Sequence, residues 1–312
     1  MHRHKTLDVL AADHRGAAVA LGNFDGVHLG HQSVIALARA AAAELNTALG
    51  VITFEPHPRS FFAPDGPAFR LMNAETRAHR LLKMGVEQLY ELPFDGYLAG
   101  QTAEAFVADI LQGALGIKHL VVGADFRFGK GRTGDIALLQ NLGPQHGFGV
   151  TIAPLISDKG VDMSSTAIRK ALSDGRPADA ERMLGHWHRI DGKVVKGDQR
   201  GRDLGFPTAN LKLDGLHLPR FGVYAVRFDV LDGPNMGNYL GAASLGERPT
   251  FGINAPNLET YVLDFEGDLY GAEVSVALVE FLRPEEKYDD IDALVRQIEA
   301  DVLDVRQVFA RS

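Results

Sequence analysis

Two histidines three positions apart follow a glycine-bracketed turn near the N-terminus and could stabilise a phosphate chain. The run at residues 22–31 reads G-N-F-D-G-V-H-L-G-H and contains His28 and His31. An apolar run precedes it at 17–21, and an Ala-rich amphipathic stretch follows at 32–45. A strand that turns into a helix start aims backbone N–H groups at a ligand, and side chains three apart on a helix share a face. The pattern favours a nucleotide site over an ordinary turn with a capping histidine.

Three further runs of the N-terminal half could complete such a site. F-E-P-H-P-R at 54–59 and G-A-D-F-R-F-G at 123–129 each follow an expected strand, where ligands bind in open α/β sheets. The prolines could instead only stiffen a loop, and the two phenylalanines could line an aromatic-ring pocket or close the core. S-S-T-A-I-R at 164–169 is typical of a helix N-cap, although Arg169 one turn further could clamp a phosphate.

The strongest signal of the C-terminal half is G-D-Q-R-G-R-D-L-G-F-P-T-A-N at 197–210. Three glycines four apart permit a close approach of backbone to ligand, although a flexible loop would use them equally. If 208–210 is extended, Thr208 and Asn210 lie on one face and can share Mg²⁺ with phosphate oxygens. The run lacks the Gly-Lys-Ser/Thr of a Walker loop.

Glu259 opens the run E-T-Y-V-L-D-F and could act as a base. Period-two alternation places it on one face with Tyr261, Leu263 and Phe265. Burial at the edge of an apolar surface would raise the pKa of this carboxyl and suit it to accept a hydroxyl proton. A glutamate at a strand end in solvent is the alternative.

The elements that must position these residues change in kind along the chain. Up to about residue 155, apolar runs alternate with helical periods, which predicts a parallel sheet in a Rossmann-like α/β domain. The expected strands are 17–21, 50–54, 88–92, 120–123 and 150–155, and the expected helices are 32–45, 75–83, 103–115 and 136–142.

After residue 183 the pattern becomes one of strands separated by turn residues, which predicts a small antiparallel β-barrel. Apolar residues at helical spacing over 289–309 predict a C-terminal helix that packs on it. Two short helices, 166–172 and 178–184, precede a boundary near Gly185, which divides the chain into 1–185 and 186–312. The expected strands of this half are 188–195, 222–228, 239–245, 260–265 and 273–282.

Composition narrows the class of protein. The 312 residues are 46% hydrophobic, enough for two full cores. The chain has no cysteine, which excludes disulfides, thiolate zinc sites and cysteine nucleophiles and favours the cytoplasm. The longest apolar stretch, 33–43, is interrupted by Arg39 and too short for a bilayer, so we expect no membrane partner. A net charge of −8 argues against nucleic-acid binding but permits small anionic ligands.

Seven segments together resemble the bacterial bifunctional riboflavin kinase/FAD synthetase family, in order and over essentially the whole chain: GNFDGVHLGHQ, FEPHP, GADFRFGKGRTGD, SSTAIR, RGRDLGFPTANL, SLGERPTFG and ETYVLDFEGDLYG. The resemblance implies that 186–312 is a riboflavin kinase domain, which makes FMN from riboflavin and ATP. It implies that 1–185 is an FMN adenylyltransferase (FAD synthetase) domain, which transfers AMP from ATP to FMN and releases FAD and pyrophosphate.

The resemblance also implies roles for single residues. His28 and His31 would stabilise the phosphates during adenylyl transfer, Glu259 would be the kinase base, and Thr208 and Asn210 would hold Mg²⁺. The implied ATP site of the adenylyltransferase comprises Gly22, Phe24, Asp25, Gly26, His28, Gly30, His31, Ser165, Thr166 and Arg169. The implied flavin site comprises Pro56, His57, Pro58, Asp125, Phe126 and Phe128. The implied ATP site of the kinase comprises Gly201, Gly205, Pro207, Thr208 and Asn210.

Two rival functions can be weighed on sequence. Another nucleotidyltransferase, such as a relative of the aminoacyl-tRNA synthetases, could use H-L-G-H, but the acidic balance and the lack of a Lys-rich signature loop count against it. A flavin-binding module without turnover could keep the barrel, but the retained Glu259, Thr208 and Asn210 count against that. Phosphoryl and adenylyl transfer need positioned donors and cations more than a covalent nucleophile, which the chain supplies.

Overall fold

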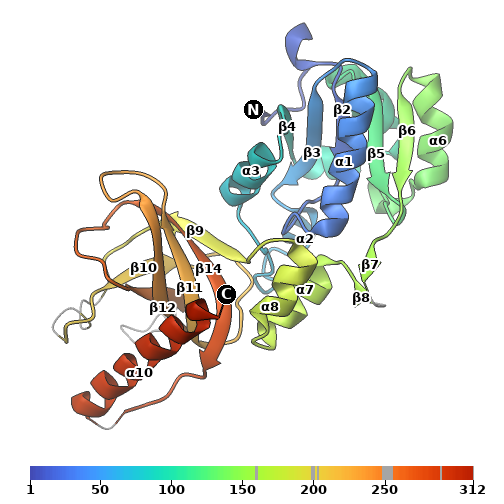
Figure 1. The fold of residues 1–312 in the computed structure, drawn as a ribbon. Coiled ribbons are helices and arrows are strands. Elements are labelled where there is room, and N and C mark those ends of the chain that lie inside the picture. The colour runs from blue at the N-terminus through green and yellow to red at the C-terminus, as the bar shows by residue number, and fades with distance from the viewer. Residues whose placement is uncertain (159–160, 198–200, 202–203, 248–255, 289, 312) are drawn as a thin grey trace. The chain divides into compact units, whose positions relative to one another are not determined.

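The computed structural model describes residues 1–158, 161–197, 201, 204–247, 256–288 and 290–311 (Figure 1). The chain divides into two compact units. The first comprises Met1–Pro67 and Ala74–Ser164, and the second comprises Ala68–Asn73 and Ser165–Ser312. The short helices that precede the barrel therefore belong to the compact unit of the barrel.

The first unit is built on a six-stranded parallel sheet of order β1-β4-β3-β2-β5-β6. From β2 the chain builds the sheet outward through β3 and β4, and then returns to place β5 on the other side of β2. The carboxyl ends of β2 and β5 therefore form the switch point at which open α/β sheets bind ligands. The strands are β1 (His2–His4), β2 (Ala18–Leu21), β3 (Leu49–Glu55), β4 (Gln88–Pro93), β5 (His119–Gly123) and β6 (Gly149–Ala153).

Helices cover both faces of this sheet. Val19 and Leu21 belong to a core cluster with the π-helix Phe106–Ala114, and Ala18 and Ala20 point to the opposite face, across which α1 lies (Figure 1). The other elements are α1 (Leu29–Glu44), α2 (Pro58–Phe62), α3 (Ala74–Lys83), α4 (Gly96–Gly100), α5 (Ala103–Ala105), α6 (Ile136–Gln145), the 3-10 turns Ala12–His14 and Lys130–Arg132, and the hairpin β7 (Ser157–Asp158) with β8 (Val161–Asp162). This arrangement confirms the predicted Rossmann-like unit.

Two helices of the first unit differ from expectation. The helix expected at 32–45 begins at Leu29, because His28 takes the N-cap position. The helix expected at 103–115 starts as α5 and continues as a π-helix over Phe106–Ala114. Apolar periodicity reports which face is buried, but it does not separate these two hydrogen-bond patterns.

The second unit is an antiparallel near-barrel followed by a helix, as predicted. Its sheet has the order β10-β13-β12-β11-β14-β9, and the Val195 N–H donates to the Asn210 carbonyl (2.9 Å), which joins the two edges. The elements are α7 (Ser165–Ser173), α8 (Pro177–Leu184), β9 (Arg189–Lys193), β10 (Thr208–Lys212), β11 (Gly222–Val230), β12 (Gly237–Glu247), β13 (Pro256–Val262), β14 (Glu273–Arg283) and α10 (Ile291–Ala310).

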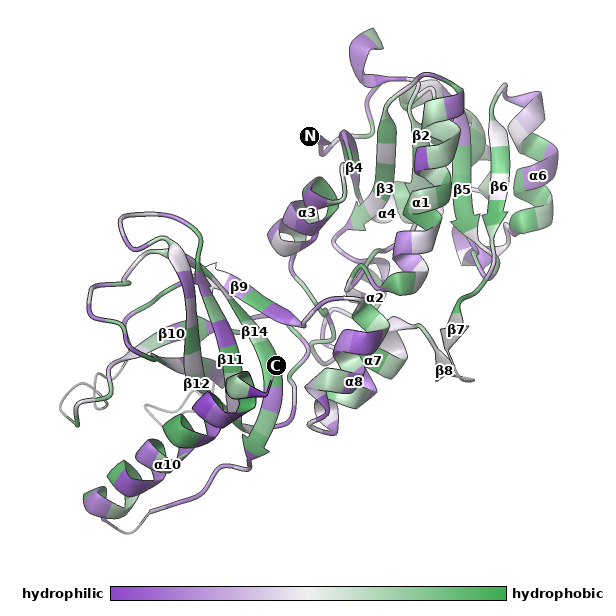
Figure 2. Ribbon diagram, in the orientation of Figure 1, coloured by the Kyte–Doolittle hydropathy of each residue, from purple (hydrophilic) through white to green (hydrophobic). Residues whose placement is uncertain are grey.

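Alternation along the strands separates the barrel interior from an outer apolar patch. Leu258 and Val262 of β13 belong to the interior cluster, whereas Val305 and Val308 of α10 pack with Ala225 on the outside. Figure 2 shows the matching alternation of apolar and polar residues along α10. A single amphipathic helix therefore covers part of the outer surface of the barrel.

The strand expected at 260–265 is placed wrongly. β13 runs from Pro256 to Val262, and the chain turns at Asp264, whose φ is +55°. Leu263 packs in the outer cluster beneath α10, whereas Phe265 packs against the barrel interior. Phe265 therefore does not share a face with Glu259, because period-two alternation ends with the strand.

Candidate active sites

The turn after β2 lies at the switch point and is tied to the neighbouring strand β3. The Gly22 N–H donates to the Ile52 carbonyl (3.1 Å), and the Thr53 hydroxyl donates to the Asn23 carbonyl (3.1 Å). On β3, the acceptor Ile52 is the middle residue of the strand and the donor Thr53 is the next residue toward its carboxyl end. The turn is therefore fixed at the place where the sheet geometry predicts a ligand.

The backbone of this turn is strained. Phe24 and Val27 have φ values of +51° and +43°, and for a β-branched residue such a value is an outlier, whereas Gly26 adopts its φ of +90° without this strain. The side chains of Phe24 and Val27 are buried, as is that of Asp25, and this burial holds the conformation. Left-handed residues of this kind cost about 1–3 kcal/mol each and cluster at ligand sites.

The predicted histidine pair forms at the start of α1. The Nδ1 atom of His28 accepts the His31 N–H (3.3 Å), and the two rings stack with centroids 3.6 Å apart. A Cβ on Gly30 would lie 3.1 Å from the His28 ring and 3.2 Å from the Met163 carbonyl, so glycine keeps this space open. The structure thus brings both imidazoles onto one surface.

Burial, and secondarily the neighbouring His28, hold the pKa of His31 well below its ordinary value. The residue keeps part of its surface open, but its Nδ1 atom is enclosed and has no hydrogen-bond partner among the described residues. His31 is therefore neutral at pH 7 and can offer a ring N–H to an anion.

The segment at the end of β3 has a clear structural role. Pro58 occupies the first turn of α2, and the Nδ1 atom of His57 accepts the Arg59 N–H (3.0 Å) as the cap. Pro56 precedes this cap. The ligand role predicted for 56–58 remains a prediction.

An aromatic cluster next to this segment was not predicted. Phe61 and Phe62 of α2 lie edge-on to Phe94, which follows β4, with ring centroids 5.5 and 5.8 Å apart, and Phe54 joins them at 5.6 Å from Phe94. The Phe62 side chain is 69% exposed. The sequence signal was the F-F pair at 61–62, one residue after F-E-P-H-P-R.

After β5, the two phenylalanines take both roles that the sequence left open. Phe128 is buried in the sheet core, whereas Phe126 is half-buried and stacks on it with centroids 5.8 Å apart. Asp125 is exposed beside them. The Phe126 ring and the Asp125 carboxylate are therefore both accessible to a ligand.

Ser165, Thr166 and Arg169 lie in the second unit, within the first two turns of α7. The Arg169 Nε donates to the Phe69 carbonyl (2.6 Å), and its guanidinium lies 5.3 Å from the centre of the Phe69 ring. The approach of these residues to the histidine pair remains a prediction.

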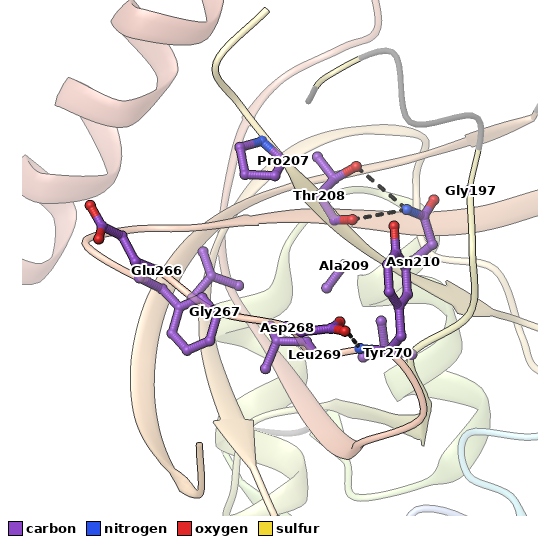
Figure 3. Close-up of a pocket in the computed structure, with 13 residues that line it drawn as sticks. Gly197, Pro207, Thr208, Ala209, Asn210, Glu266, Gly267, Asp268, Leu269 and Tyr270 are labelled. Atoms are coloured by element: carbon purple, nitrogen blue, oxygen red, sulfur yellow. Dashed lines mark hydrogen bonds between the residues drawn. The ribbon is translucent and has the colours of Figure 1, made fainter. Parts of the chain in front are cut away.

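The barrel carries a pocket of about 370 Å³ beside β10 (Figure 3). β10 is extended, as the sequence argument required, and the Asn210 Nδ2 donates to the Thr208 carbonyl (3.2 Å) and hydroxyl (3.4 Å). Sequence reasoning missed the opposite wall, residues 265–270, which include Phe265 and Tyr270. The pocket is lined by Val194, Gly197, Pro207, Thr208, Ala209, Asn210, Val262, Phe265, Glu266, Gly267, Asp268, Leu269 and Tyr270.

The two predicted loop glycines close a turn before this pocket. The Gly201 carbonyl accepts the N–H groups of Leu204 (3.2 Å) and Phe206 (2.8 Å), and Gly205 has a φ of +86°. Neither glycine lines the pocket as formed by the described residues. Residues 198–200 and 202–203 of this loop, and 248–252 of S-L-G-E-R-P-T-F-G, lie outside the described residues.

Glu259 is half-buried on β13, directly opposite Asn210 of β10 and Ser244 of β12. Asn257, which sequence reasoning missed, links two of them: its Nδ2 donates to Glu259 Oε1 (3.0 Å) and to Asn210 Oδ1 (3.2 Å). The sheet thus brings together a carboxylate and the Thr208–Asn210 pair, which are far apart in sequence.

The oxygen donors of this pair suit magnesium. Mg²⁺ is usually held by one or two protein oxygens together with phosphates and water, and Thr208 and Asn210 supply a hydroxyl and an amide oxygen. Across the described ranges, no group of three or more His, Asp or Glu residues could hold a metal by itself. The donor set therefore fits a metal that arrives with a phosphate ligand.

The fold and these sites define a two-part enzyme that uses nucleotides, with a glycine-bracketed turn at the switch point of a Rossmann-like unit and a second pocket in a β-barrel. The family model for FAD synthetase matches residues 10–167, and the model for riboflavin kinase matches residues 184–309. The chain therefore belongs to the family of bifunctional riboflavin kinase/FMN adenylyltransferases.

Full-length relatives agree with this assignment. The bifunctional riboflavin kinase/FMN adenylyltransferase of Escherichia coli (strain K12) is 40% identical over 298 residues, which cover 96% of this chain and 94% of that protein. The protein of the same name from Pseudomonas fluorescens is 41% identical over 304 residues, with 97% and 96% covered.

A solved structure matches both units. A crystal structure named as a macrolide-efflux protein of Streptococcus pneumoniae has a TM-score of 0.85 and 33% identity, with 98% of each chain covered. That name concerns the other protein. Within the described ranges of this chain, every helix is too short or too polar to cross a membrane.

Proposed function

We propose that this chain phosphorylates riboflavin to FMN with ATP, and then transfers AMP from a second ATP to FMN to give FAD and pyrophosphate. The observation that carries the proposal is the pair of matched domains, each of which coincides with a site suited to its reaction. The phosphate turn lies within the FAD synthetase match, and the Thr208–Asn210 pocket lies within the riboflavin kinase match.

We assign the two activities to residues 1–185 and 186–312. The change from an α/β to a β architecture and the start of the riboflavin kinase match at residue 184 support this division. The compact units divide earlier, at Ser164, so α7 and α8 fold with the barrel. Both short helices therefore belong to the adenylyltransferase part by this assignment, although they fold with the barrel.

For adenylyl transfer, we assign His28 and His31 to the α-phosphate and the leaving pyrophosphate. A neutral imidazole donates a hydrogen bond without the cost of burying a charge, and such preorganised donors stabilise the charge that develops in the transition state. Gly22, Asp25 and Gly26 shape the turn. Ser165, Thr166 and Arg169 are assigned to the same nucleotide.

For FMN in the same reaction, we assign the region after β3 and β5. The half-buried ring of Phe126 and the exposed Phe62 cluster offer apolar surface to a flavin ring system, and Pro56–Pro58 stiffen the segment at the start of α2. Asp125 and Arg127 flank Phe126 in sequence, and of the two we assign Asp125 to this site.

For riboflavin phosphorylation, we assign Glu259 as the base that accepts the proton of the flavin hydroxyl. Thr208 and Asn210 would hold Mg²⁺, which would neutralise the charge of the phosphates during the transfer. Pro207, Gly201 and Gly205 set the path of the loop that enters β10. We further propose that the protein works in the cytoplasm, on the ground of its cysteine-free composition.

One experiment tests the whole proposal. The purified chain is mixed with riboflavin and Mg-ATP, and the flavins are separated by chromatography over time. FMN should appear first and FAD afterwards. Unchanged flavins with ATP consumed on another acceptor would indicate a different nucleotidyltransferase, and riboflavin bound but unchanged would indicate a flavin-binding module.

A further inference from the structure

Three neighbouring strands of the barrel present a regular polar grid on the outer face. Asn210, Glu259 and Ser244 form one row across β10, β13 and β12. The next row is Lys212, Asn257 and Gly246. Asn257 lies two residues from Glu259 on the same strand, so both side chains emerge on the same face.

The side-chain amide of Asn257 spans the two rows. Its Nδ2 atom lies 3.0 Å from Glu259 Oε1 and 3.2 Å from Asn210 Oδ1. An ionised carboxylate and an amide oxygen are both acceptors, so only the nitrogen end of Asn257 can face them. One –NH₂ group therefore uses its two hydrogens on two different acceptors.

This face already carries several carboxylates. The Glu285 side chain, which follows β14, lies over Gly246, where any Cβ would overlap its Oε1. Burial, then Glu247, and also Glu259 raise the pKa of Glu285, while Arg283 opposes them. The Asn257 amide is therefore an uncharged donor close to these carboxylates. The exposed Lys212 of β10 lies opposite Asn257 in the strand register.

We propose that Asn257 is a positioning residue of the kinase site, which holds the Glu259 carboxylate next to Asn210 so that proton acceptor and metal ligand are presented together. The inference rests on the proposed function of Glu259 as the base. Asn210 Oδ1 retains a second lone pair for a metal while it accepts from Asn257. Partners of this kind typically change activity by about 10–100-fold when removed.

The test uses the full-length chain with two substitutions at this position. Asn257→Ala removes the donor and should lower kcat for riboflavin phosphorylation by about 10–100-fold, with the riboflavin KM nearly unchanged. Asn257→Asp keeps the shape but places a second carboxylate against Glu259. The substitution replaces the donor by a second acceptor, so it should lower kcat at least as much as Asn257→Ala, again with the riboflavin KM nearly unchanged.

A matched control removes another amide–carboxylate bond from the same barrel. Asn238 of β12 donates to Asp229 Oδ1 (2.8 Å), away from the grid, so Asn238→Ala should keep both kcat and KM. Riboflavin binding is followed separately by the quenching of flavin fluorescence without ATP, and it should be equal in all variants. FMN-to-FAD turnover on the same preparations should also be equal.

Glu259→Gln, measured in parallel, separates the inference from the assignment on which it rests. If Glu259→Gln is inactive while both Asn257 variants keep the wild-type kcat, the positioning role is wrong and the base assignment stands. If Glu259→Gln keeps full turnover, the base assignment fails and the positioning role fails with it. A rise in the riboflavin KM of Asn257→Ala with an unchanged kcat would also overturn the proposal, because a positioning residue acts on turnover and not on binding.

Discussion

His188 makes the stability of the barrel unit depend on pH. The residue is 4% exposed just before β9, and its carbonyl accepts the Leu278 N–H (3.1 Å). Burial, with smaller contributions from His186 and His217, lowers the pKa of His188 from 6.5 to about 3. Between these two values the unfolded chain binds a proton at this position that the folded chain refuses. The contribution of His188 to stability is therefore fully present above pH 6.5 and is lost as the pH drops toward 3.

The size of the effect follows from the pKa difference. Each pH unit inside this window changes the free energy of unfolding by roughly 1.4 kcal/mol, and pH 5 lies about 1.5 units below 6.5. Titration of His188 alone should then destabilise the unit by about 2 kcal/mol between pH 7 and pH 5. In His188→Gln this titration is absent, so the free energy of unfolding of the variant should fall by about 2 kcal/mol less than that of the wild type between pH 7 and pH 5.

The assay uses Trp187, the single tryptophan of the chain, which packs in the cluster beneath α10 and so reports on this unit. Urea unfolding is followed by its fluorescence at pH 7, 6 and 5 for the wild type and His188→Gln, and the free energies are extrapolated linearly. His79→Gln, at an exposed position on α3 of the other unit, is the control and should follow the wild type. Equal losses in wild type and His188→Gln would refute the reasoning.

Three other predictions concern the division of labour. His28→Ala and His31→Ala should each lower FMN-to-FAD turnover by about 10²–10³-fold and spare riboflavin phosphorylation, because they remove donors from the phosphate turn. Unchanged FAD formation in both variants would contradict the assignment. Glu259→Gln should lower FMN formation by about 10²–10⁴ while added FMN is still converted to FAD, and parallel loss of both activities would indicate misfolding instead. Fragments 187–312 and 165–312 should both phosphorylate riboflavin. The longer fragment should be more stable to urea, because it retains α8, which packs on β14. If the longer fragment is inactive while the full chain is active, the kinase needs the first unit.

Elements with a strong hydrophobic period were predictable. The expected strands at 17–21 and 50–54 match β2 and β3 within one residue at each end, since buried parallel strands are continuous apolar runs. β1 was missed, because H-R-H at residues 2–4 has no apolar pattern and becomes a strand only by pairing with β4 at the sheet edge. Such an edge strand is specified by its neighbour rather than by its own residues.

The strand that carries Glu259 was displaced for a similar reason. N-A-P-N-L before Glu259 has the composition of a loop, yet Asn257 and Leu258 pair with β10 and β12. Cross-strand pairing overrides local preference, because strand propensity depends on packing context. Because the predicted strand began at residue 260, Asn257 was not among the predicted site residues.

The two candidate sites also differ in how visible their geometry is in sequence. The turn from Gly22 to His31 is contiguous, so its glycines and histidines can be recognised as one motif. In the barrel, Asn210 and Asn257 are 47 positions apart and meet only because antiparallel register sets them on adjacent strands. A shift of that register by one residue would turn Asn257 and Glu259 to the barrel interior. The barrel site therefore depends on the packing that fixes the register of β13, whereas the turn depends on local backbone strain and the burial of Phe24 and Val27.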